Sequence, residues 1–326
     1  MKYLVIVIFL GIVLISCEKD GTNNNNTTDV SLSMGQGYMN DVFYGLNDNN
    51  ITTADRTSWD IAFNTYVMSP SILINGGNGV KLFEVSKDTN DWYNPVDTSG
   101  ISSWTKLNNS NTTWDIGAFS GNMGGGFDFG WGVYLSAPSH NVVGSSVFLI
   151  KLPDNSARKI LIRMKNGYQN SVNFVYANID GTEEKNVTIY CNDYSDKEYV
   201  YYSVSSNSVI DREPPADNWD LLFTQYYDTQ INYIVTGVLS KPGVKVAKVT
   251  GVAPSAADTT MADFSSSIST IGYDWKQIDM MTYQYSLVEN VSYFVKTTGN
   301  HVYQLYFSDF EGSSTGNIKF KKKMIK

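Results

Sequence analysis

The sequence predicts an all-β protein with minor helix, built as two tandem copies of an antiparallel β-domain. Aromatic residues make up 13% of the chain, with 22 Tyr, whereas charged residues reach only 17%. Tyr, Trp and Thr favour strands, and the many Asn, Ser and Gly residues favour the turns between them. No long helical period is present, and one aromatic block is repeated. These observations predict short strands in two similar units.

The repeated block is Trp-Asp followed by two apolar residues, Phe, two variable residues and Tyr. It spans Trp59–Tyr66 and returns 160 residues later as Trp219–Tyr226. Three flanking blocks keep the same order in both copies: Asp41–Leu46 with Tyr199–Val204, Val147–Lys151 with Ser292–Lys296, and Asn173–Tyr176 with Asn317–Phe320. The later blocks predict a β-hairpin near the end of each copy.

The order of these blocks predicts one domain over residues 31–192 and a second over residues 193–326. The separation between matching blocks falls from 160 to about 145 residues, which places roughly 15 additional residues in the first copy, within Trp92–Gly132. Two other arrangements fit the repeat. The chain could form one sandwich from two pseudo-symmetric halves, or one copy could serve as a spacer.

Residues 1–16 have the layout of a secretory signal peptide, because Lys2 precedes an apolar run over residues 4–15. Such a run is too short to cross a bilayer, which takes about 20 residues. The small Ser16 before Cys17 resembles a bacterial lipobox, so we expect lipid on Cys17; an incidental cysteine is the alternative. Residues 17–30, rich in Asn and Thr, are expected to form a flexible tether.

The segment Glu18-Lys19-Asp20 resembles the signal that directs lipoproteins of Bacteroidota to the outer face of the outer membrane. We therefore expect a protein that faces the cell exterior and meets the membrane only through its lipid. Without the signal peptide, which contains one basic residue, the chain has 23 basic residues left of 24 against 32 acidic ones, a net charge of −9. This charge disfavours nucleic acid and anionic headgroups as partners.

The Trp-Asp blocks and the final hairpin resemble the HmuY family of haem-binding lipoproteins of Bacteroidota. In the second copy the resemblance is carried by Asn218–Leu222 with Tyr226, Val291–Asn300, Gln304–Phe310 and Thr315–Phe320, and the first copy shows it again. The resemblance implies an antiparallel β fold. It also implies capture of haem or a related porphyrin without turnover, for transfer to a TonB-dependent outer-membrane receptor.

Haem iron takes axial donors, commonly His or Met, inside an apolar slot. Members of the family carry such donors on loops before the last hairpin. The chain has only His140 and His301, so a bis-histidine site cannot lie in the second copy. His140 precedes the hairpin of the first copy and is a candidate ligand, with a loop histidine of no function as the alternative. His301 is predicted to be a turn residue.

In the second copy Met280 and Met281 occupy the loop before the final hairpin, where the resemblance implies a ligand. Met261, on the preceding segment, is the candidate for the opposite donor. Tyr283 and Tyr285 follow in the same loop and could line the slot or bind ferric iron. We expect haem iron to be held by Met280 or Met281 with Met261; the alternative is that the methionines fill gaps in the core.

No Ser-His-Asp set, zinc-ligand spacing or dinucleotide fingerprint is present, so we expect a binding protein and no enzyme. Cys191 lies in an apolar strand and is predicted to be a buried, inert thiol. The alternative function is a β-rich surface module that binds glycan or a protein partner. Trp92, Trp104 and Trp114, in the enlarged region of the first copy, would then stack on sugars.

Overall fold

The computed structural model describes residues 27–326 as 22 β-strands and nine 3-10 helices. No helix in this range exceeds five residues. The strands pair antiparallel, which confirms the predicted all-β class. No helix in this range is long and apolar enough to cross a bilayer. The signal peptide, Cys17 and most of the tether, residues 1–26, lie outside the described residues.

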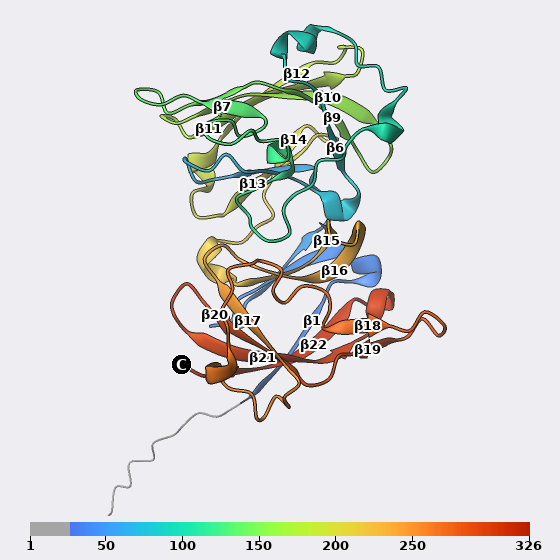
Figure 1. Cartoon of the computed structure of the whole chain (residues 1–326), viewed down its shortest axis with the longest axis vertical. Helices are drawn as coiled ribbons and strands as arrows, with labels where there is room; N and C mark the ends of the chain where they lie inside the picture. Colours follow the sequence, from blue (N-terminus) through green and yellow to red (C-terminus); the bar gives the residue numbers. More distant parts are fainter. Residues whose placement is uncertain (1–26) are drawn as a thin grey trace, which may run out of the picture.

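The strands form two stacked β-sandwiches (Figure 1), which we name the lower half (residues 27–56 and 219–326) and the upper half (residues 57–218). One sheet of the lower half has the order β1 (Thr28–Ser33), β22 (Asn317–Met324), β21 (Val302–Phe310), β20 (Val291–Lys296) and β17 (Lys245–Thr250). The other has the order β16 (Tyr233–Ser240), β15 (Leu221–Asp228), β2 (Asn40–Tyr44) and β3 (Ile51–Asp55). A separate hairpin joins β18 (Lys276–Ile278) and β19 (Tyr285–Leu287). Alternate residues of the two larger sheets meet in one apolar core.

The upper half repeats this plan with a larger first sheet. That sheet contains β12 (Lys185–Tyr190), β11 (Ser171–Asn178), β10 (Ala157–Asn166), β9 (Val147–Lys151), β6 (Lys81–Ser86), β8 (Val142–Gly144) and β7 (Gly132–Tyr134). The facing sheet has the order β14 (Ser208–Ile210), β13 (Tyr199–Ser203), β4 (Ile61–Asn64) and β5 (Ile72–Ile74). Cys191 is fully buried in the core between them, which confirms the predicted burial of this thiol, and burial raises its pKa.

Each Trp-Asp strand pairs with a hairpin from a distant part of the chain. The strand after the first block, β4, pairs with β13, and the strand after the second block, β15, pairs with β2. Asp60 accepts a hydrogen bond from the N–H of Val204 (2.8 Å), and Asp220 accepts one from the N–H of Leu46 (2.8 Å). Both carboxylates thus close the turn of the hairpin beside them.

The expected division into residues 31–192 and 193–326 does not match this pairing. The N-terminal strands β1 to β3 complete the lower half, so the upper half is inserted between β3 and β15. The predicted division is wrong because the hairpins β2–β3 and β13–β14 have similar aromatic sequences. Sequence alone therefore does not tell which of the two Trp-Asp strands each hairpin will join. The two cores are separate, and the chain therefore forms two sandwiches, not one.

The tryptophans of the enlarged region pack against protein. Trp92 is 3% exposed. Trp104 is edge-on to Phe83, with ring centroids 6.1 Å apart, and the Trp114 Nε1–H donates to the carbonyl of Ser240 in the other half (2.8 Å). The prediction of an exposed stacking platform at these three rings is therefore wrong.

Candidate functional site

The methionines expected to bind iron lie at the tip of an exposed hairpin. Met280 and Met281 are 70% and 91% exposed in the turn between β18 and β19, and Tyr283 is 70% exposed. The carboxylate of Asp279 accepts the N–H of Met281 (2.7 Å) and closes this turn. Tyr285 begins β19 and is 38% exposed. Figure 1 shows the hairpin projecting from the lower half.

Met261 lies at the end of a short 3-10 helix on another face of the lower half. The residues that follow it pack on the outer face of the five-stranded sheet, around Phe294. Trp275, at the base of the methionine hairpin, packs on the inner face. The structure therefore does not bring Met261 together with Met280 or Met281, and the expected axial pair is not assembled.

The upper half has a counterpart of the methionine hairpin, formed by β7 and β8, and its loop carries His140. Trp131 precedes β7 as Trp275 precedes β18; the two rings are 0% and 1% exposed and lie 144 residues apart. Strand β8 also pairs with β10, whereas β18 and β19 pair only with each other. The His140 loop is consequently held against the sheet of the upper half.

His140 borders an open cleft with a volume of about 250 Å³. The other lining side chains are mainly apolar or aromatic: Met68, Pro70, Phe127, Phe129, Tyr134 and Val142. The Nδ1 atom of His140 and the hydroxyl of Tyr134 are 2.6 Å apart, and the Phe127 ring stacks on Tyr134 with centroids 5.7 Å apart. This is the one predicted ligand that the structure places in an aromatic cleft.

The contact with Tyr134 determines what His140 can do. When Nδ1–H donates to the hydroxyl, Nε2 carries the lone pair and is the atom left to bind a metal. His140 has a φ of 51°, in the left-handed region that few residues other than glycine adopt. Met68, 53% exposed, adds a thioether at the same cleft. The cleft thus offers an oriented nitrogen donor and a sulfur donor.

The loop that carries Met68 is held from beneath by the buried Lys165. Its Nζ donates to the carbonyl oxygens of Asn64 (3.1 Å), Tyr66 (2.7 Å) and Ser69 (2.6 Å). Burial lowers the pKa of Lys165 to about 8. Charge-assisted hydrogen bonds are stronger than neutral ones, so three of them fix the position of this loop.

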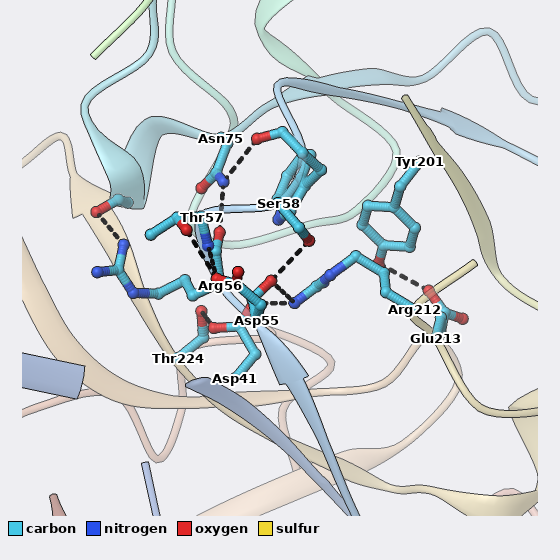
Figure 2. A network of polar contacts seen from close by, with 12 residues as sticks. Asp41, Asp55, Arg56, Thr57, Ser58, Asn75, Tyr201, Arg212, Glu213 and Thr224 are labelled. Atoms are coloured by element: carbon cyan, nitrogen blue, oxygen red, sulfur yellow. Dashed lines mark hydrogen bonds and ion pairs between the residues drawn. The ribbon is translucent and has the colours of Figure 1, made fainter. Parts of the chain in front are cut away.

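A buried polar network joins the halves where the chain crosses between them (Figure 2). The network contains Asp55-Arg56 at the first crossing and Asp211-Arg212 shortly before the second, a repeated pair that sequence reasoning missed. Arg212 donates to the carboxylate of Asp41 (2.6 Å), and both side chains are 3% exposed. Burial alone would lower the pKa of Arg212, but the carboxylate of Asp41 raises it above its usual value.

Arg56 secures the other crossing. Its guanidinium donates to the carbonyls of Tyr38 in the lower half (2.8 Å) and Gly77 in the upper half (3.0 Å). A Cβ at Gly77 would lie 1.8 Å from the carbonyl oxygen of Gln225, so the halves approach each other too closely for any side chain here. The interface is therefore closely packed and depends on backbone contacts.

A small cavity beside this network does not suit a porphyrin. Its volume is about 70 Å³, against about 300–1,000 Å³ for sites of drug-sized ligands. Among the described residues, Arg212 Nε, Trp59 Nε1 and the Tyr226 hydroxyl have no hydrogen-bond partner, and all three residues line the cavity. Unpaired polar groups around such a volume are typical of ordered water.

The network makes stability depend on pH through Glu213. Burial raises the pKa of Glu213 to about 7. Hydrogen bonds from the Tyr201 hydroxyl (2.7 Å) and the Glu198 N–H (2.8 Å) act in the opposite direction and lower it. Glu213 therefore binds a proton more tightly in the folded state than in the unfolded state. Its contribution to the free energy of unfolding is greatest below pH 4.5 and is lost as the pH rises through about 7.

This pH dependence can be measured by urea unfolding of wild type and Glu213→Gln at pH 5 and at pH 8. Between these two pH values, the free energy of unfolding of wild type should fall by about 3 kcal/mol more than that of Glu213→Gln. Parallel curves for the two proteins would contradict this.

Comparison with known proteins gives only distant similarities. No family model matches the chain, and no curated protein matches its sequence. The solved structures to which the chain is similar include the following three. Apo PinO from Porphyromonas gingivitis has a TM-score of 0.28 and 8% identity, over 92% of this chain and 98% of that one. A proposed lipoprotein from Bacteroides fragilis has a TM-score of 0.23 and 12% identity, over 48% of this chain and 89% of that one. A proposed HmuY-like haem-binding protein from Bacteroides vulgatus has a TM-score of 0.20 and 13% identity, over 48% of this chain and 92% of that one.

Proposed function

We propose that this protein is a lipid-anchored surface protein that binds haem or a related porphyrin, without turnover, in the His140 cleft. The observation that carries the proposal is the His140–Tyr134 pair at the border of an aromatic cleft. A histidine that ligates a metal characteristically donates its other ring N–H to a fixed partner.

The residues of the cleft fit the chemistry of haem. The cleft has a volume of about 250 Å³, smaller than the pockets of about 300–1,000 Å³ that enclose a whole ligand, so a porphyrin would enter it by one edge and leave the other edge in solvent. Phe127 and Phe129 supply the apolar, flat surfaces that a porphyrin needs, and His140 supplies an axial nitrogen. Met68 is the residue we assign as a possible second axial donor.

In the proposal, the lipid anchor holds the protein at a membrane through β1 of the lower half, and the cleft lies in the upper half (Figure 1). Ten residues, 18–27, separate Cys17 from β1. A chain of ten residues spans at most about 35 Å, so the lipid would keep the two sandwiches close to the outer membrane. Transfer of haem to a TonB-dependent receptor in that membrane is the expected next step.

A hemin titration of the chain beginning at residue 27 tests the proposal. We expect a sharpened Soret band at one equivalent, at least tenfold weaker binding by His140→Ala, and roughly tenfold weaker binding by Tyr134→Phe because the imidazole loses its orienting partner. His301→Ala is the matched control, since His301 lies exposed in the turn between β20 and β21, and should bind as wild type. Loss of binding in Met280→Ala or Met281→Ala, with His140→Ala unaffected, would move the site to the methionine hairpin and contradict the proposal.

A further inference from the structure

A second depression borders the cleft at Val67, which lines both. It is an open groove of about 540 Å³ on the surface of the upper half. Unlike the cleft, its lining is dominated by hydroxyl, amide and charged groups, and it contains no His or Met. The groove therefore suits a different ligand from a porphyrin.

Two tyrosines present their rings to solvent along this groove. Tyr66 is 65% exposed and Tyr168 is 86% exposed. Their backbones are fixed, because the N–H of Tyr66 donates to the side chain of Asn64 (2.9 Å) and that of Tyr168 to the side chain of Asn166 (2.9 Å). Rigid aromatic rings with a polar edge make contact area at low cost in conformational entropy.

The groove also holds polar atoms without partners. Asn170 is 9% exposed, and its amide nitrogen donates to Thr65 O (2.9 Å) and Asn192 Oδ1 (3.0 Å). Its Oδ1 is buried without a partner among the described residues. The carboxylate of Glu198 makes no hydrogen bond or ion pair within residues 27–326, whereas the adjacent Lys197 is paired outside the groove. Buried acceptors left unpaired cost free energy until a donor reaches them.

We propose that this groove binds a neutral oligosaccharide. The apolar C–H faces of the sugar rings would stack on Tyr66 and Tyr168, and sugar hydroxyls would donate to Asn170 Oδ1 and the Glu198 carboxylate. The unpaired carboxylate, in a chain of net charge −8, repels sulfated or otherwise anionic sugars. The groove shares Val67 with the haem cleft but would bind its ligand through other side chains. Sugar binding is thereby assigned to Tyr66 and Tyr168 and not to the three tryptophans.

The inference is tested by screening the chain that begins at residue 27 against neutral and acidic oligosaccharides. The neutral oligosaccharide that binds most tightly is then used for titration. We expect Tyr66→Ala and Tyr168→Ala each to weaken binding at least tenfold, and Glu198→Gln to weaken it severalfold. Tyr93→Ala is the matched control, because Tyr93 is 80% exposed and lies outside the groove, and should bind as wild type.

The inference is overturned if no neutral oligosaccharide binds, or if both groove variants bind it as tightly as wild type does. A preference for acidic sugars would also overturn it. Hemin titration of Tyr168→Ala should match wild type, so a failure here is distinguishable from a failure of the haem proposal.

Discussion

Asp41→Asn is expected to lower the free energy of unfolding by about 3–5 kcal/mol, since removal of one partner leaves a buried charge uncompensated. The guanidinium of Arg212 would retain the Asp55 carbonyl at 3.5 Å and three ring faces, Tyr201 at 4.9 Å and Phe43 and Trp59 at 5.7 Å, but no carboxylate within ion-pair distance among the described residues. Asparagine keeps an oxygen for the Thr224 hydroxyl, so the lost interaction is mainly the charge. Urea unfolding followed by tryptophan fluorescence measures the effect.

The control for this variant is Asp309→Asn. Asp309 pairs with Lys319 at 2.8 Å, but their side chains are 44% and 49% exposed, and such surface pairs contribute at most about 1 kcal/mol. Adding Arg212→Met to Asp41→Asn should recover part of the loss, because no unpaired buried charge remains. Equal effects of Asp41→Asn and Asp309→Asn would show that the crossing does not depend on the ion pair.

The local structure was readable from the sequence, but the pairing between distant strands was not. The repeated blocks at Trp59 and Trp219 predicted strands in both copies, and a strand, β4 or β15, follows each tryptophan. Alternation says which face of a strand is buried and nothing about which of two equal hairpins will join it. The exchange of hairpins had no local signal.

The candidate site was readable in part for the same reason. His140 was found because it precedes a hairpin, whereas Tyr134 and Phe127 were missed because only the pairing of β7 with β8 brings them to it. Met68 comes from a loop about 70 residues earlier in the chain, so only the fold brings it to the cleft. Met281 was overvalued because the family resemblance implied a ligand in its loop, whereas Asp279 closes a turn that leaves Met281 exposed to solvent.

Lys165→Met is expected to weaken both proposed binding sites together. The ammonium joins the carbonyls of Asn64, Tyr66 and Ser69, and this loop presents Tyr66 to the groove and Met68 to the cleft. Methionine keeps most of the length of the side chain but has no ammonium group. The three carbonyls lose their donor, and each buried carbonyl left without one costs about 1–3 kcal/mol. The loop should then lose its fixed position, and affinities for hemin and for the oligosaccharide should both fall about tenfold.

Lys159→Met is the matched control on the same strand, β10. Lys159 is 2% exposed and donates to the carbonyls of Trp92 (2.6 Å) and Asn94 (3.1 Å), which belong to neither site. Both variants should be destabilised, but only Lys165→Met should affect binding, whereas His140→Ala should affect hemin alone and Tyr66→Ala the sugar alone. If the two lysine variants bind both ligands equally well, the loop is positioned by its other contacts, and Lys165 stabilises the fold without organising the two sites.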